Sequence, residues 1–335
     1  MPFSFDPDIV CKTCPYGGCI EDRRNNPVRG RTTLFRLRQN TALSCTFSYF
    51  VPGTDNDSEP SRTFDDYLSQ FRKNALLAGK AIFDASFNLD KAALAKVEGD
   101  VFELIDIAAM WNAAATWNVY MDTGAWTSEV FSIPPNSVPT PRRKVAIVKL
   151  PRGYDATKLF KTNVRNSILA HESALQLRGM ELGLSAPDLV GIRIPDAAPA
   201  GYTPFLTPLP NLSDQSRALI ENAYSSIEGT VEARSFLFAI AVKRTTRSDR
   251  LYQPLFEANV LKYLIEVVLG GAAFRFNVHL GSFEGSDVRG HYKAASLISL
   301  VRGGAPSLAV DRLLLAQKPR EMAQETLNDF PMFPL

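Results

Sequence analysis

The chain has 335 residues, enough to bury one large hydrophobic core or two modest ones. Its 37 lysines and arginines nearly balance 35 acidic residues, so the net charge of +2 excludes a uniformly basic protein that coats nucleic acid. The longest apolar run, Phe236 to Val242, is too short to cross a membrane, and residues 1–6 have neither the basic nor the apolar region of a signal peptide. We therefore expect a cytoplasmic protein without a membrane partner.

The basic residues are concentrated in three patches. Residues 23–54 are rich in arginine and contain no acid, and two further patches run from Arg142 to Arg152 and from Lys243 to Arg250. The arginines of the first patch are Arg23, Arg24, Arg29, Arg31, Arg36 and Arg38. Any one patch is as often an ordinary solvated surface, but three of them favour DNA as a partner.

The four cysteines raise the question of a zinc site. Cys11 and Cys14 have the spacing of zinc ligands, and Cys19 and Cys45 could complete a tetrahedron. A second C-x-x-C pair is missing and the other spacings are irregular, so we favour reduced free thiols and leave zinc as the alternative.

A long helix is predicted over residues 91–121, where apolar residues recur at steps of three and four. These residues are Val97, Val101, Leu104, Ile105 and Ala108. Strands are predicted over four short stretches rich in branched or aromatic residues, 144–150, 189–194, 235–243 and 272–280. Residues 236–242 are all apolar, which is typical of a central strand covered on both faces.

The connecting segments complete a mixed α/β pattern. Ser213 can cap a helix that ends before Gly229, and another helix is predicted from Pro254 to Leu269. The proline clusters at 134–141 and 195–210 predict exposed irregular loops. Strands and helices alternate, so we expect a mixed sheet flanked by helices around one core.

Candidate metal ligands occur near two of the predicted strands. Asp188 follows a proline and opens one strand, and Glu257 lies on the helix that follows another. Hard cations such as Mg²⁺ prefer carboxylate oxygens and can activate a phosphodiester for hydrolysis. Glu257 shares a helical stripe with Leu261 and Leu264, where an unpaired carboxylate would be costly. Metal binding would remove that cost, and so would pairing with Lys243.

Lys243 closes an apolar strand, so its amine should emerge at the edge of the core. There it could orient or deprotonate an attacking water, or stabilise charge on a phosphate, although a strand-end lysine is often a solvated cap. Glu103 is a third candidate acid and shares a helix face with Asp100. For these two acids, taken alone, a solvated helix surface is the better interpretation.

A short arginine-rich motif, Arg247-Ser248-Asp249-Arg250, follows the candidate lysine. Arginine can donate two hydrogen bonds to guanine, and a carboxylate can accept from the amino group of cytosine. The motif could therefore read adjacent G·C pairs in the major groove, with an internal arginine–aspartate pair as the alternative.

Together these residues resemble the CCGG-reading group of type II restriction endonucleases, in the PD-(D/E)xK nuclease superfamily. Ala241 stands where the superfamily usually has an acid two residues before the lysine, and in this group the acid comes from the next helix, the place of Glu257. The SgrAI-like members are most similar, over stretches at residues 27–29, 110–112, 141–143 and 247–260.

The resemblance implies a PD-(D/E)xK core at residues 66–335 behind an N-terminal DNA-contacting extension at residues 1–65. It implies a staggered double-strand break in a palindromic site containing CCGG, with 5′ overhangs and 5′-phosphates. The cofactor would be Mg²⁺, with Mn²⁺ able to substitute. The partners would be double-stranded DNA and a second copy of the chain, with dimers pairing into tetramers or larger assemblies on two sites.

The resemblance also assigns roles to individual residues. Asp188 and Glu257 would hold the metal, Glu103 would support the site, and Lys243 would be the catalytic lysine. The readers of CCGG would be Arg247, Asp249 and Arg250. Arg31 and Lys96 would contact DNA outside the core of the site.

Three other functions fit the sequence less well. A structure- or damage-directed repair nuclease would need neither CCGG nor Arg247 and Arg250. A non-catalytic DNA-binding protein is disfavoured because every catalytic position holds a competent residue. A nucleophilic hydrolase is disfavoured because none of the histidines, His171, His279 and His291, lies near a serine or cysteine nucleophile motif.

Overall fold

The computed structural model describes residues 20–22, 35–37, 62–82, 91–126, 132–134, 143–183, 187–245, 248–271, 273–282, 287–302 and 305–333. The four cysteines, Arg31 and Arg247 lie outside these ranges, as do residues 135–142 of the first proline cluster. Lys96, Asp249 and Arg250 are placed on helices by their backbones, and their side chains lie outside the described part of the structure.

A five-stranded mixed sheet forms the centre of the protein, and the sequence predicted the mixed sheet and four of its five strands. Its strand order is β3-β4-β5-β6-β7, with β3, β4 and β5 antiparallel and β5, β6 and β7 parallel. The strands are β3 (Val145–Lys149), β4 (Leu189–Arg193), β5 (Phe236–Lys243), β6 (Arg275–Leu280) and β7 (Arg312–Leu314). A separate antiparallel pair joins β1 (Ile20–Asp22) to β2 (Phe35–Leu37).

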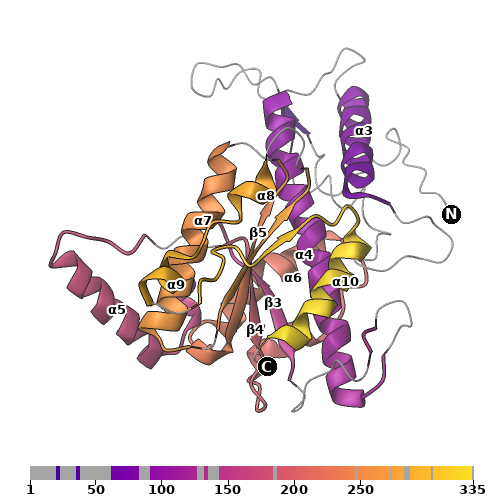
Figure 1. Ribbon diagram of the computed structural model, residues 1–335. Helices are drawn as coiled ribbons and strands as arrows, with labels where there is room; N and C mark the ends of the chain where they lie inside the picture. The colour runs from indigo at the N-terminus through magenta and orange to yellow at the C-terminus, as the bar shows by residue number, and fades with distance from the viewer. Residues whose placement is uncertain are drawn as a thin grey trace.

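Helices cover both sides of this sheet. Figure 1 shows α7 (Ser248–Lys262) and α9 (Leu297–Arg302) on one side, and α4 (Lys91–Thr123) with α10 (Pro319–Asp329) on the other. The remaining α-helices are α3 (Phe64–Ile82), α5 (Thr162–Gln176), α6 (Asp214–Asn222) and α8 (Val288–His291). Short 3-10 helices span Ala156–Leu159, Ala200–Leu206, Ala223–Ile227, Ala233–Ser235 and Phe330–Met332, and a π-helical turn at Tyr263–Val268 extends α7.

Helix α4 confirms the predicted long helix and is buried more completely than its apolar stripe indicated. Every residue from Val101 to Ala115 except Glu103 is buried, because the helix contacts β3 and β5 on one side and α10 on the other. Buried amides on this helix pair with backbone groups: Asn118 accepts from Val145 N and donates to Val145 O, both at 2.8 Å. These contacts fix α4 against the first strand of the sheet.

No helix in the described part of the chain is long and apolar enough to span a membrane.

Two predictions were wrong, one about the second proline cluster and one about the start of helix α7. The second proline cluster is not an exposed loop throughout, because Tyr202 and Phe205 of a 3-10 helix are buried against the core. Asn112 of α4 holds the end of this segment by accepting from Leu209 N at 2.7 Å. Helix α7 begins at Ser248 rather than at Pro254, so Pro254 lies within the helix. By contrast, Ser213 does cap α6, where its hydroxyl accepts from Ser216 N at 3.3 Å.

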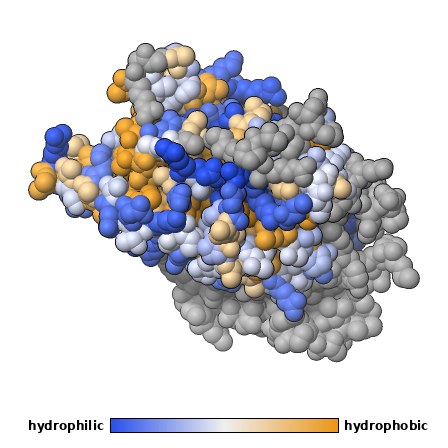
Figure 2. Space-filling view, turned by 90° about the horizontal axis from the view of Figure 1, so that it is seen from below, coloured by the Kyte–Doolittle hydropathy of each residue, from blue (hydrophilic) through white to orange (hydrophobic). Residues whose placement is uncertain are grey.

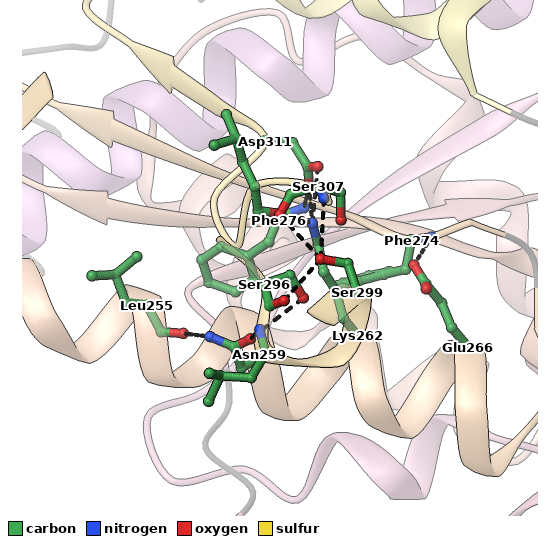
Figure 3. Close-up of polar contacts among 12 residues, drawn as sticks. Leu255, Asn259, Lys262, Glu266, Phe274, Phe276, Ser296, Ser299, Ser307 and Asp311 are labelled. Carbon is green, nitrogen blue, oxygen red and sulfur yellow. Dashed lines mark hydrogen bonds and ion pairs between the residues drawn. The ribbon is translucent and has the colours of Figure 1, made fainter. Parts of the chain in front are cut away.

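The C-terminal half of helix α7 is anchored by buried polar contacts (Figure 3). The Lys262 ammonium is only 4% exposed, and it donates to Leu308 O at 2.7 Å and pairs with Asp311 at 2.8 Å. The same Asp311 carboxylate accepts from Phe276 N at 2.7 Å, which ties the helix to β6. Asn259 accepts from Leu297 N at 2.8 Å and holds the start of α9. These contacts fix the direction of α7, whose opposite end carries the arginine motif.

Gly191 occupies a position in β4 where no side chain fits. A Cβ there would lie 2.0 Å from the ring of Phe238, and that ring is buried and stacked on Phe333 at 4.6 Å. We expect Gly191→Ala to lower the free energy of unfolding by about 1–3 kcal/mol, measured by urea denaturation, because the ring cannot yield. Gly99→Ala is the control, since nothing lies within 4 Å of its Cβ position on α4. It should raise stability by up to about 1 kcal/mol, and equal stability of the two variants would contradict this account.

Candidate active site at one end of the sheet

The antiparallel pairing of three strands brings three charged residues to one end of the sheet. Lys149 ends β3 and pairs in register with Leu189, so it lies beside the first residues of β4. Leu189 in turn pairs with Ile240 near the end of β5, which closes with Lys243. Asp188, which immediately precedes β4, is therefore placed between the ends of its two neighbouring strands.

Asp188 is fixed by both neighbouring strands. One of its carboxylate oxygens accepts from Lys243 Nζ at 2.8 Å and from Val242 N at 2.7 Å. Its backbone carbonyl accepts from Leu150 N at 3.1 Å, just beyond β3. The Asp188 side chain is 22% exposed and the Lys243 side chain is 15% exposed, so the pair is largely buried but accessible to solvent. The structure thus brings Asp188 and Lys243, two of the candidate site residues, into direct contact.

Glu103 joins this group from helix α4. Its carboxylate pairs with Lys149 Nζ, and the two side chains are only 18% and 17% exposed. Glu103 is thus not on a solvated helix surface. Lys149 also belongs to the site, although from the sequence it is recognisable only as part of a basic patch. Its place at the end of a predicted strand, like that of Lys243, was the signal that could have identified it.

The charges of the four residues interact. Burial raises the pKa of the Glu103 carboxyl, and the nearby negative charge of Asp188 adds to the rise. Lys149 opposes it by its charge and its hydrogen bond, and Lys243 opposes it by its charge. Two carboxylates and two ammonium groups therefore share one small region, and their formal charges cancel.

The donor set fits a hard divalent cation. Asp188 and Glu103 bring carboxylate oxygens close enough for their charges to repel, and such oxygens are the ligands that Mg²⁺ prefers. Among the residues that the structure describes, no group of three or more histidine, cysteine, aspartate or glutamate side chains is arranged to hold a metal ion. Any site here would therefore be built on these two carboxylates, with other ligands supplied by water or substrate.

Glu257 lies on α7 and is held by different neighbours. It is buried, and it accepts a hydrogen bond from Gln253 Nε2 at 2.6 Å. Burial and the negative charge of Glu257 raise the pKa of Tyr292, whose hydroxyl is buried and has no hydrogen-bond partner within the described residues. The contacts that join Asp188, Lys243, Glu103 and Lys149 do not include Glu257. The acid paired with Lys243 is Asp188 and not Glu257, which was the alternative partner that the sequence allowed.

The backbone places part of the arginine motif at the start of a helix beside this site. Ser248, Asp249 and Arg250 form the first turn of α7, five to seven residues after Lys243. Arg244 of the same basic patch pairs with Glu98 of α4, which also pairs with Arg72 at 2.6 Å. That part of the patch is therefore neutralised within the protein.

The opposite end of the sheet has a polar cavity of about 210 Å³. Arg143 there pairs with Asp196, and Lys161 pairs with Glu232 at 2.6 Å. Figure 2, which views the molecule from below, shows a hydrophilic band with hydrophobic residues on either side. The carboxylates of this cavity are paired with surface cations, whereas the group around Asp188 is largely buried, so we place the active site at the Asp188 end.

Comparison with known proteins identifies the fold and the family of the chain. No curated protein matches the sequence closely. Two solved structures share the fold: "Crystal structure of Type IIF restriction endonuclease Bse634I with cognate DNA" (TM-score 0.70, 19% identity, 92% of this chain and 96% of that chain) and "Bse634I restriction endonuclease" (TM-score 0.69, 19% identity, 92% and 95%). Residues 57–329 match a family described as Cfr10I/Bse634I restriction endonuclease. The chain, with its paired acids and lysines at one end of a mixed sheet, therefore belongs to the Cfr10I/Bse634I restriction endonuclease family and is a site-specific deoxyribonuclease.

Proposed function

We propose that this protein is a Mg²⁺-dependent type II restriction endonuclease that makes a staggered double-strand break in a palindromic site containing CCGG, leaving 5′ overhangs and 5′-phosphates. The observation that carries the proposal is the Asp188–Lys243 pair at 2.8 Å, with Glu103 beside it, at the end of the sheet from which helix α7 departs. The short distance along the chain from Lys243 to the first turn of α7 supports the proposal that hydrolysis and base reading take place near each other.

Asp188 and Glu103 are the residues that would hold Mg²⁺ or a substituting Mn²⁺, and we propose Glu257 as a further ligand on the family resemblance alone. When bound, the cation supplies charge neutralisation on the scissile phosphate and a more acidic water. Lys243 is held by Asp188 in a position to donate to a phosphate oxygen or to orient the attacking water. Asp188 is itself fixed by two backbone contacts, so both groups are positioned before DNA binds.

Sequence reading is assigned to Arg247, Asp249 and Arg250, of which Asp249 and Arg250 lie in the first turn of α7. A helix N-terminus in the major groove places its first side chains against base edges, and arginine and aspartate suit guanine and cytosine. Arg31, in the proposed DNA-contacting extension at residues 1–65, and Lys96 are proposed to contact DNA outside CCGG. A palindromic site calls for two symmetric active sites, so we propose a homodimer, and larger assemblies on two sites. We also propose that, within the CCGG-reading group, this protein is most similar to the SgrAI-like members.

The proposal is tested by incubating plasmid and genomic DNA with the protein and Mg²⁺ and mapping the ends. We expect 5′-phosphorylated ends before the first C of CCGG and no cutting in excess EDTA. Ends scattered without a common sequence would reject the CCGG assignment. Cutting that survives exhaustive chelation would reject the metal dependence.

Arg250→Ala is expected to reduce discrimination between CCGG and a site with one altered base pair by about 1–3 kcal/mol, because a two-pronged contact to guanine would be lost. The measurement is the ratio of single-turnover cleavage rates on the two duplexes. Arg178→Ala is the control, since Arg178 is an exposed residue just after helix α5 and should leave the ratio unchanged. An unchanged ratio for Arg250→Ala would remove it from the base-reading group.

A further inference from the structure

We propose that Lys149 is a counter-cation built into the active site, which competes with the divalent metal ion for Glu103 and so sets how tightly the metal binds. The inference rests on the proposed metal dependence and assigns a role to a residue that the proposed chemistry does not use. Lys149 is then a positioning residue for Glu103 in the metal-free protein.

Lys149 and Glu103 form a buried ion pair beside a second acid. The Lys149 ammonium contacts the Glu103 carboxylate directly, and both side chains are more than four-fifths buried. Glu103 faces the negative charge of Asp188 at the same time. Without a cation beside it, Glu103 would be an uncompensated buried charge next to a like charge, an arrangement that proteins avoid.

The site contains two ammonium groups, Lys243 and Lys149, and the proposed hydrolysis needs only one of them. Lys243 is held by Asp188 and has the place of the catalytic lysine. Lys149 instead occupies an oxygen of the acid that the metal would use. A divalent ion approaching Asp188 and Glu103 must displace or repel this ammonium group, because both cations require the same carboxylate.

A second lysine–acid pair, at the opposite end of β3, provides a comparison. Lys144, just before β3, pairs with Asp122 of α4 at 2.7 Å, so both ends of β3 are joined to α4 by a lysine–acid pair. Asp122 is 57% exposed, whereas the carboxylate of Glu103 is buried beside Asp188. A pair that only fastened β3 to α4 would resemble Lys144–Asp122. The Lys149–Glu103 pair differs because Asp188, a second acid, lies close enough for its charge to act on Glu103.

The test is Mn²⁺ binding to the DNA-free protein, measured by the fall of the free-ion signal in electron paramagnetic resonance. Lys149→Met keeps the aliphatic chain and removes the charge, and we expect it to bind Mn²⁺ about tenfold more tightly than the wild type. A residue that merely held the site in shape would give weaker binding when removed. Lys144→Met is the matched control, and it should leave the Mn²⁺ affinity unchanged.

A second measurement does not involve affinity. In EDTA, Lys149→Met should lower the melting temperature by about 2–4 °C, since Glu103 is left unpaired, and saturating Mn²⁺ should restore it. Adding Glu103→Gln to Lys149→Met should remove the loss in EDTA, because the unpaired charge is gone.

The outcomes separate the two proposals. If the wild type binds Mn²⁺ and Lys149→Met binds it equally or more weakly, the counter-cation role is rejected and the proposed function stands. If neither DNA-free protein binds Mn²⁺, the counter-cation role is rejected, whereas the metal dependence of cleavage is rejected only if cutting survives exhaustive chelation.

Discussion

Lys243→Met is expected to lower the rate of DNA cleavage by about 10²–10³-fold or more while the protein stays folded and still binds DNA. Lys243 Nζ lies 2.8 Å from Asp188, at the end of a fully buried strand, so its ammonium is presented to the site in one orientation. Methionine preserves the length and packing of the side chain and removes the charge that acts on phosphate or water. The measurement is the single-turnover cleavage rate of a CCGG duplex at saturating enzyme and Mg²⁺.

The control for this variant is another lysine in an ion pair. Lys161 pairs with Glu232 at 2.6 Å at the opposite end of the sheet, and its side chain is 45% exposed. Lys161→Met should cleave at the wild-type rate. Binding of the CCGG duplex, measured in Ca²⁺ to prevent cleavage, should change little for Lys243→Met, because Asp188 remains available to the cation. Full cleavage by Lys243→Met would show that the lysine is not part of the chemistry.

The sequence predicts this site where the chemistry follows strand ends. Asp188 just before one strand and Lys243 at the end of another are recognisable because apolar runs mark the strands. The structure contains both strands, and Lys243 Nζ lies 2.8 Å from an Asp188 carboxylate oxygen. Glu103 is recognisable only as an acid on a long helix. Its burial depends on how α4 lies against the sheet, and a tertiary arrangement of that kind leaves no local mark in the sequence.

The residues that were missed depend on register. Lys149 reaches the site because it pairs with Leu189, about 40 residues later, and no periodic pattern specifies which residues of two distant strands face each other. The start of α7 was misplaced because proline is common in a first turn, whereas this helix begins at Ser248 and has Pro254 inside it. Strand β7, only three residues long, has too few residues to show an alternating pattern.

A buried ion pair beneath the site gives the second large effect. His279 of β6 and Asp106 of α4 are both fully buried, with His279 Nδ1 and Asp106 Oδ2 2.7 Å apart and His279 Nε2 3.1 Å from Ala316 O. His279 pairs in register with Val242, whose amide holds Asp188, and Asp106 lies one helical turn after Glu103. The pair therefore joins α4 to the sheet directly below the four charged residues.

Asp106→Ala is expected to lower the free energy of unfolding by about 3–5 kcal/mol, because it leaves a buried imidazole without its partner. The size of this effect should depend on pH. Burial disfavours the charged imidazolium, but the charge and hydrogen bond of Asp106 outweigh it and raise the pKa of His279 above its ordinary value of 6.5. A raised pKa contributes stability that is fully present below about pH 6.5 and is lost as the pH rises through the folded-state pKa.

The stability of the wild type and of Asp106→Asn should therefore differ more at pH 6 than at pH 9, as measured by urea denaturation. Asparagine keeps the shape and can still hydrogen-bond the neutral imidazole, so the part of the difference that comes from charge should vanish at high pH. Glu325 also favours the charged imidazole, so a small pH dependence should persist in the variant. A difference that is constant from pH 6 to pH 9 would show that His279 is neutral in the folded protein. Asp106 would then hold α4 above the sheet through a hydrogen bond alone, and the position of Glu103 would not depend on a buried charge.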